Sequence, residues 1–238
     1  FKERNFSGAL SVLPEIDESV PGIWPDSFAE MVRTIRPWAQ FYSAWDRLDY
    51  NAANTFVTTL PSSSDTEWKQ LAPTGDMCDW VRELSAPPPK IDQEDYFSLM
   101  AVRTRKIAVD LLANGLRRIR HHQYEDAFIR AYRVLELVGQ IALFENGYDS
   151  AHLPKDNAIV IEHIDIRGKK GKSAFSKAPG GKLEASREQV AIFLKHLGHP
   201  IGKTLLRLAQ DPELPSATTS PVAWWCQRTS KRTARQGA

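Results

Sequence analysis

Two long amphipathic segments separated by a short turn constrain the fold of this chain more than any other feature. In the first, apolar or small residues recur at helical spacing, and the segment ends near Arg120. In the second, the same periodicity begins at Tyr124 and stops at Asn146 and Gly147, residue types that often end a helix. Because only residues 121–123 separate them, we expect an antiparallel αα-hairpin whose apolar stripes pack against each other. The two stripes comprise Ala108, Leu111, Leu112, Gly115 and Ile119, and then Tyr124, Ala127, Phe128, Ala131, Leu135, Val138 and Ala142.

Shorter helical patterns lie on both sides of this hairpin. An interior proline, Pro37, is expected to kink or split one of them, because proline removes a backbone hydrogen bond and clashes with the preceding turn. The β-branched run 159–166 is typical of a strand and allows a small β-hairpin at 158–167. We therefore expect an all-α fold, mainly a helical bundle built from αα-hairpins, with this hairpin as a β insertion. The further helices are expected over 28–48, over 50–60, over 65–84 with interruptions at Pro73 and Gly75, near 185–197 and near 201–210.

Three consecutive prolines mark the clearest boundary inside the chain. Pro87, Pro88 and Pro89 favour a stiff extended segment and cannot continue a helix. The sequence thus predicts four parts, which are a helical connector region at 1–85, a Pro-rich linker at 86–90, a helical bundle at 91–211 with a loop insertion at 147–183, and an irregular basic tail at 212–238.

Composition excludes several classes of protein. The two cysteines, Cys78 and Cys226, have neither CxxC nor metal-site spacing, which indicates a reducing compartment without a disulfide framework or structural zinc. No apolar run approaches the length of a membrane span, and no segment resembles a signal peptide. We therefore expect a cytoplasmic protein without metal or cofactor. Phe1 stands where an initiator Met would, so we expect the chain to continue a longer protein.

Two basic segments are candidates for contacts with RNA phosphates. Lys169, Lys170 and Lys172 lie in the loop 168–181, which lacks the spacing of a phosphate-binding P-loop. Arg232 lies among four basic residues in the last eleven, whereas the rest of the chain carries 27 basic and 29 acidic side chains. A mobile insertion and a solvated tail are the alternative interpretations.

Other polar residues allow a chemical and a structural interpretation. His196 and His199, and likewise His163 and Asp165, have donor types that suit acid–base catalysis or metal binding, but no carboxylate or cysteine cluster accompanies them. The alternative interpretation, which the sequence favours, is that these are ordinary surface residues. The Trp45-Asp46-Arg47 sequence favours a structural role, in which an indole and an adjacent ion pair fix a helix crossing.

Three segments carry a resemblance to a known family. Residues 41–53, FYSAWDRLDYNAA, resemble the WDRFDY..A signature of the Cas02710-type CRISPR-associated proteins, relatives of the Csm6 and Csx1 effectors. The DLLAN sequence at 110–114, followed by residues 124–137, is similar to that family's DLLANA.RR and GRYDDAVARLYRALEL segments. Residues 194–202, LKHLGHPIG, resemble its L..LGDPLG segment. The similarity extends in order over about residues 1–210.

The resemblance implies an architecture and an activity. Proteins of this family carry an N-terminal CARF domain, which binds cyclic oligoadenylate, and then a helical region that ends in a HEPN domain, a metal-independent endoribonuclease. By resemblance, this chain is the part after the CARF domain, and the 91–211 bundle is HEPN-like. A homodimer acting on single-stranded RNA in type III antiviral defence is implied, with cyclic oligoadenylate acting only through a CARF domain outside this chain.

The catalytic motif of that family is the main departure. HEPN sites use an Arg and a His four to six residues apart, which the family supplies as RN.SILAHG after the LGDPLG-like segment. Here residues 211–217 read DPELPSA, and no histidine follows His199. The one Arg-x4-His match is Arg117 and His122, which on a helix would lie about 140° apart and share a face poorly. Cations at a solvated helix C-terminus explain this pair as well.

Three hypotheses follow. The first is the HEPN-like part of a CRISPR-associated effector with ribonuclease ancestry, inactive as this chain stands. The second is a non-catalytic helical scaffold for a protein partner. The third is a nucleic-acid-binding module that uses the 168–182 loop and the tail.

Overall fold

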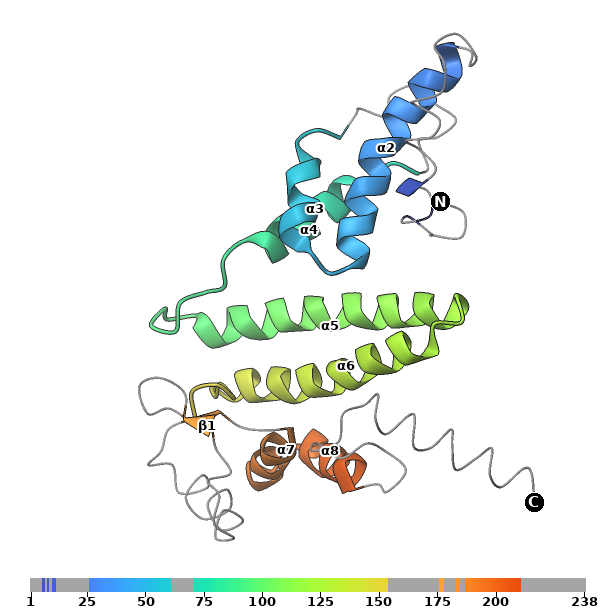
Figure 1. Cartoon of the computed structure of the whole chain (residues 1–238). Helices are drawn as coiled ribbons and strands as arrows, with labels where there is room; N and C mark the ends of the chain where they lie inside the picture. Colours follow the sequence, from blue (N-terminus) through green and yellow to red (C-terminus); the bar gives the residue numbers. More distant parts are fainter. Residues whose placement is uncertain are drawn as a thin grey trace, which may run out of the picture. The chain divides into compact units, whose positions relative to one another are not determined.

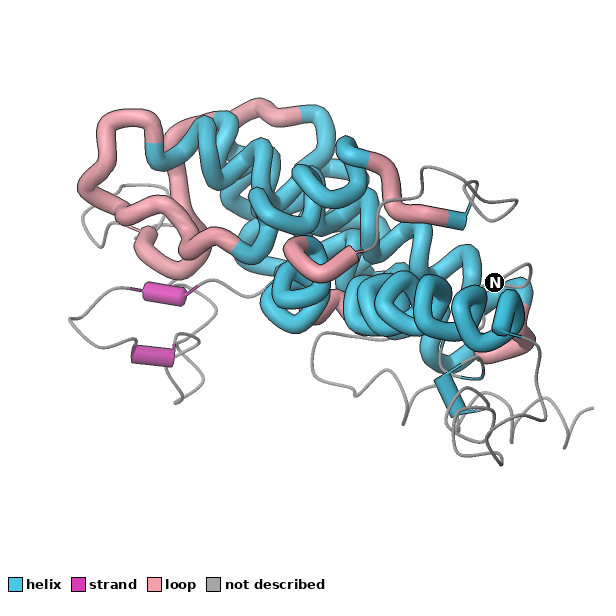
Figure 2. The backbone as a smooth tube through the Cα atoms, turned by 90° about the horizontal axis from the view of Figure 1, so that it is seen from above, coloured by secondary structure: helices cyan, strands magenta, loops and turns pink. Residues whose placement is uncertain are grey.

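The computed structural model describes residues 6, 8, 10, 11, 26–60, 71–153, 176, 177, 183, 184 and 187–210. Helices account for most of these residues, and the expected all-α fold is confirmed (Figures 1 and 2). The chain divides into two compact units, residues 1–87 and 88–238. None of the described helices combines the length and the apolarity that crossing a lipid bilayer requires.

The first unit contains helices α2 (Asp26–Asp46), α3 (Tyr50–Val57) and α4 (Gly75–Ser85). Pro37 does not split α2, which is assigned as one helix through the proline. The residues directly after it explain this continuity. Trp38, Ala39 and Phe41 are completely buried, so packing against the rest of the unit offsets the lost backbone bond.

Side-chain caps set where α3 and α4 begin. The Asp49 carboxylate accepts a hydrogen bond from the Ala52 backbone N–H at 3.0 Å, and the Thr74 hydroxyl accepts one from Met77 N–H at 3.3 Å. The predicted interruption around Pro73 and Gly75 is therefore the point at which α4 starts. The expected earlier start of this helix, at residue 65, lies outside the described residues.

The core of the first unit is aromatic. Phe41 and the ring of Trp45 meet edge to face at 5.7 Å between centroids, and Tyr42 stacks parallel to Trp45 at 6.5 Å. Trp45 thus packs in the hydrophobic core of this unit. The buried residues of this cluster are Phe41, Ala44, Ala53, Val57, Cys78 and Val81.

The second unit is built on the αα-hairpin of α5 (Tyr96–Arg120) and α6 (Tyr124–Glu145). These helices run antiparallel side by side, and α7 (Arg187–His196) and α8 (Pro200–Gln210) pack on α6 (Figure 1). The cluster of buried side chains between α6, α7 and α8 is Ala142, Leu143, Leu153, Val190, Ala191, Phe193, Leu194 and Leu205.

Two glycines let the helices of this cluster approach closely. A Cβ on Gly202 of α8 would lie 2.3 Å from the backbone N of Lys195 in α7, closer than packed atoms allow. A Cβ on Gly139 of α6 would lie 3.0 Å from Val190 Cγ1. The α7–α8 pair therefore depends on the missing side chain at Gly202 more strictly than the α6–α7 contact depends on Gly139.

The predicted apolar stripes are partly wrong. Leu112 and Ile119 are 53% and 50% exposed, and Tyr124 is 51% exposed, although each was expected to pack inside the hairpin. Ala131 is also exposed. The buried face of α5 lies about one residue earlier around the helix and uses small side chains, which let α5 and α6 approach closely. This face comprises Ala101, Thr104, Ala108, Leu111, Asn114 and Gly115.

Two short strands occur where a loop was expected. Strand β1 (Ser176–Lys177) pairs antiparallel with β2 (Leu183–Glu184), with Ser176 opposite Glu184 and Lys177 opposite Leu183. The predicted hairpin at 158–167 lies outside the described residues.

Candidate functional site

The tip of the α5–α6 hairpin is shaped by a histidine in a left-handed backbone conformation. His122 has a φ of 58°. Its N–H bonds to Ile119 O at 3.0 Å, and the next N–H, of Gln123, bonds to Arg118 O at 2.8 Å. This pair of bonds is the Schellman arrangement that ends many helices, in which glycine is the usual residue at the position of His122. The backbone therefore leaves the helical path at His122.

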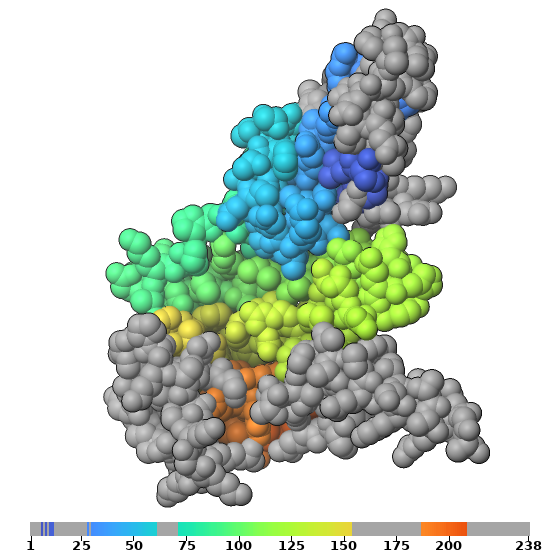
Figure 3. Space-filling view, in the orientation of Figure 1, coloured from blue at the N-terminus to red at the C-terminus, as the bar shows by residue number. Residues whose placement is uncertain are grey.

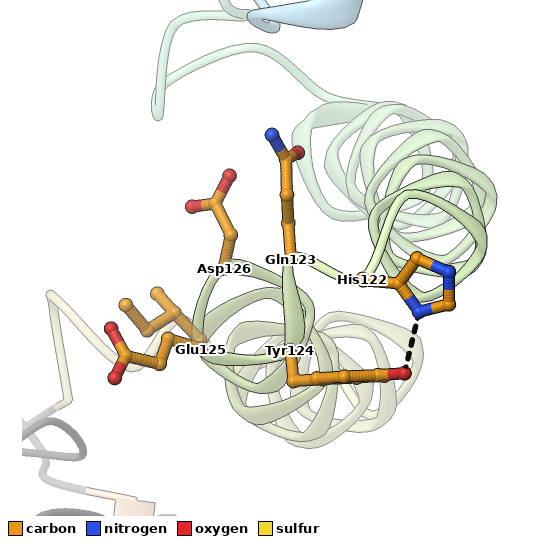
Figure 4. A pocket seen from close by; sticks show the side chains of 6 residues that line it. His122, Gln123, Tyr124, Glu125 and Asp126 are labelled. Carbon is orange, nitrogen blue, oxygen red and sulfur yellow. Dashed lines mark hydrogen bonds between the residues drawn. The ribbon is translucent and has the colours of Figure 1, made fainter.

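The side chain of His122 is held by its neighbour. Its Nδ1 lies 2.8 Å from Tyr124 Oη, a hydrogen bond whose donor depends on the imidazole tautomer (Figure 4). The two rings meet at 72° with centroids 5.9 Å apart. Within the described part of the chain, Nε2 of this imidazole has no hydrogen-bond partner.

Two partly buried arginines stabilise the tip through ion pairs with one carboxylate. Asp126 bonds to Arg130 at 2.7 Å through Oδ1, and its Oδ2 lies 3.5 Å from Arg118 Nε. Arg118 also donates to Gln123 Oε1 at 2.8 Å. The Arg118 and Arg130 side chains are 20% and 16% exposed, so these ion pairs are screened less than surface pairs. The cluster ties the end of α5 to the start of α6.

A shallow depression of about 570 Å³ lies in front of these residues at the first turn of α6. No side chain caps this turn, and the side-chain oxygen Oε1 of Gln123 accepts a hydrogen bond from Arg118 instead. The tip forms part of the outer surface, yellow-green in Figure 3. The depression is lined by His122, Gln123, Tyr124, Glu125, Asp126 and Ile129.

The predicted catalytic pair falls at this tip but not on one helix. Arg117 lies in the last turn of α5, whereas His122 lies beyond the end of that helix and bonds to Tyr124. A HEPN pair needs both side chains on a helix, so this geometry differs from that of the family motif.

Two other sequence candidates, His196 and His199, lie where α7 ends and α8 begins. His196 is the last residue of α7, and His199 Nδ1 accepts a hydrogen bond from Ile201 N–H at 3.3 Å at the start of α8. The His199 side chain thus caps the N-terminus of α8. No group of three or more His, Cys, Asp or Glu side chains in the described residues is arranged to hold a metal. His163, Asp165, Lys169, Lys170, Lys172 and Arg232 lie outside the described residues.

A second polar cluster, which the sequence did not reveal, lies at the opposite end of the hairpin. Asp149 is 7% exposed and accepts three hydrogen bonds, from Tyr96 Oη at 2.7 Å, from Ala151 N–H at 2.8 Å and from His152 Nδ1 at 2.6 Å. Burial, and then the bond to Asp149, raises the pKa of Tyr96 above its ordinary value. The local signal that could have indicated this site is the Asx-turn pattern at 149–151. Nothing in the sequence links that pattern to Tyr96. The cluster anchors the loop after α6 to the start of α5.

Comparison with known proteins finds a family match within the second unit. No match to this chain was found among curated proteins or solved structures. The family model described as the Csm6 HEPN domain matches residues 100–207. This range covers nearly all of α5, all of α6 and α7, and most of α8. Residues 100–207 of this chain are therefore similar to the HEPN domain of the CRISPR-associated protein Csm6.

Proposed function

We propose that this chain is the HEPN-containing helical part of a cytoplasmic CRISPR-associated effector, descended from ribonucleases and acting as a homodimer. The observation that carries the proposal is the match of the Csm6 HEPN domain to the α5–α8 bundle. A HEPN site is composite, since each of two protomers contributes an Arg and a His to it. The dimer belongs to the proposal for this reason.

We further propose that the chain as it stands does not cleave RNA. All six of its histidines lie at or before position 199, and the family motif is expected after the segment at 194–202. The single Arg-x4-His match has its histidine outside the helix, where the imidazole is tied to Tyr124. Without a paired imidazole, proton transfer to or from the RNA 2′-hydroxyl lacks its usual catalyst.

Retained RNA binding and control by cyclic oligoadenylate complete the proposal. The basic residues at 169–172 and Arg232 would contact phosphates, and such contacts weaken steeply as salt increases. Control by cyclic oligoadenylate would act through a CARF domain elsewhere in the protein.

Incubation of the purified chain with single-stranded RNA, with and without cyclic oligoadenylate, tests the loss of activity. We expect binding without cleavage under both conditions. Cleavage that disappears in His122→Ala, but persists in the control His199→Ala, would overturn the proposed inactivity and assign catalysis to the hairpin tip. Absence of any salt-dependent RNA binding would instead favour a scaffold for a protein partner.

A further inference from the structure

We propose that one face of α5 is the surface through which two copies of this chain pair, with the two α5 helices antiparallel. This inference rests on the proposed homodimer and specifies the surface and the register of that dimer. We call this face of the helix the α5 stripe. It consists of Val102, Val109, Leu112, Leu116 and Ile119, each 48–53% exposed.

The spacing of the stripe suits a helix partner. Its residues follow one another at intervals of seven, three, four and three, which is the heptad pattern of helices that pack along their length. The pattern extends over eighteen residues, from Val102 to Ile119, or about 25 Å of helix. The neighbouring face of α5 is already used against α6, so the stripe is a second, separate packing surface of the same helix. Five large aliphatic side chains in one row are also more than scattered surface residues explain.

A second copy fits this surface because the stripe is complementary to itself. In one antiparallel register, Val102 lies opposite Ile119 of the partner, and Val109 lies opposite Leu112. The same two-fold axis repeats both contacts, so all four residues meet apolar side chains. Only Leu116 meets a charged residue, Arg105, whose guanidinium forms an ion pair with Glu145 of its own chain.

Charge selects the antiparallel over the parallel arrangement. Arg105, Lys106 and Arg120 lie in or beside the stripe. In parallel pairing each of these cations would meet its own copy. In the antiparallel register these positions pair with positions 116, 115 and 101 of the partner helix, none of which carries a charge, so like charges are not directly opposed.

Longer-range repulsion remains, and it gives the dimer an unusual salt dependence. Helix α5 carries six Lys or Arg residues and one Asp, a net charge of +5. Salt screens repulsion between two such helices and leaves the apolar contact in place. We therefore expect self-association to strengthen as salt is raised from 50 to about 500 mM, opposite to the behaviour of RNA binding.

Sedimentation velocity over a concentration series tests the surface. We expect a reversible dimer whose dissociation constant rises at least about 100-fold in Leu112→Arg. The matched control is Ala131→Arg, which adds the same charge at an exposed position of α6 and should leave the dimer intact. Circular dichroism of both variants reports whether they fold. A folded Leu112→Arg chain that still dimerises would overturn the α5 stripe while leaving the homodimer standing. A wild-type chain that is monomeric at every concentration and salt would overturn both, and would indicate that another partner or another part of this chain covers the stripe.

Cysteine cross-linking tests the register. In a background with Cys78→Ala and Cys226→Ala, a mixture of Val102→Cys and Ile119→Cys chains should form a disulfide-linked dimer upon mild oxidation. Val102→Cys alone should not, because its two copies would lie about 25 Å apart along the helices. Efficient cross-linking of Val102→Cys alone would overturn the antiparallel arrangement.

Discussion

The hydroxyl of Tyr96 donates a hydrogen bond of 2.7 Å to Oδ2 of Asp149, a buried carboxylate 53 residues further along the chain. Tyr96 is the first residue of α5, and Asp149 follows the end of α6. The bond therefore closes the open end of the hairpin, as the Arg118–Asp126 contact closes its tip.

Removing this hydroxyl should destabilise the second unit. We expect Tyr96→Phe to lower the free energy of unfolding by about 1–2 kcal/mol, because a buried carboxylate loses one of its three donors. Urea unfolding followed by circular dichroism measures the change. Tyr124→Phe is the matched control, since its exposed hydroxyl should contribute less than about 0.5 kcal/mol. Equal effects in the two variants would contradict a special role for the bond to Asp149.

The same tyrosine should make stability depend on alkaline pH. The pKa of Tyr96 is raised in the folded chain, first by burial and then by its acceptor Asp149. Below the unfolded value of about 10, the hydroxyl is neutral in both states and its contribution is complete. Above about pH 10, the unfolded chain loses this proton first, so stability falls as pH rises, by up to about 1.4 kcal/mol per pH unit.

Comparison of wild type with Tyr96→Phe between pH 9 and 11.5 isolates this effect. We expect the variant to lose less stability over this range, and absorbance at 295 nm to show that one phenol fewer is protected from ionisation in the folded variant. Parallel pH curves for the two proteins would contradict the raised pKa.

The contact between α7 and α8 should tolerate no side chain at Gly202. Gly202→Ala places a Cβ against the backbone of Lys195, which cannot move aside without separating the helices, and we expect a loss of about 3 kcal/mol or more. In Gly139→Ala the contacts are side-chain atoms of Val190 and Leu205, which can shift, so about 1–2 kcal/mol is expected. Thermal unfolding measures both. Gly75→Ala, where a Cβ meets nothing within 4 Å, serves as control and should be neutral or slightly stabilising.

The ion pairs at the hairpin tip should contribute more than those on the surface. Asp126→Ala leaves Arg118 and Arg130 without their shared carboxylate, and we expect a loss of about 1–2 kcal/mol. Glu136→Ala removes the partner of Arg133, an exposed side chain, and should cost less than about 0.5 kcal/mol. Urea unfolding at low and high salt tests this ranking. A reversed order would show that the tip is not braced by Asp126.

Periodicity predicted the hairpin well because α5 and α6 are long and their turn is short. It failed on the phase of the packed face, because large aliphatic residues were taken as buried. In α5 the buried face instead contains Thr104 and Asn114, and the larger Leu112 and Ile119 lie outside it. Close helix packing selects small residues, and hydrophobicity alone does not distinguish such a face from a second apolar surface.

The polar sites could be predicted only where their contacts are local. The basic end of α5 and the turn after it were visible in the sequence, but a histidine in the left-handed position of a helix-ending motif was not, since glycine normally occupies it. The Tyr96–Asp149 bond joins residues far apart in the chain, and no local pattern encodes it.

The burial of Leu153 has a consequence for the segment that joins it to helix α7. Leu153 is 1% exposed in the cluster it shares with Leu143 and Phe193, and Asp149 fixes the turn just before it. The chain is thus held against this cluster both at Leu153 and at helix α7. A change in the number of residues between these two points should therefore leave the packing of α7 on α6 intact.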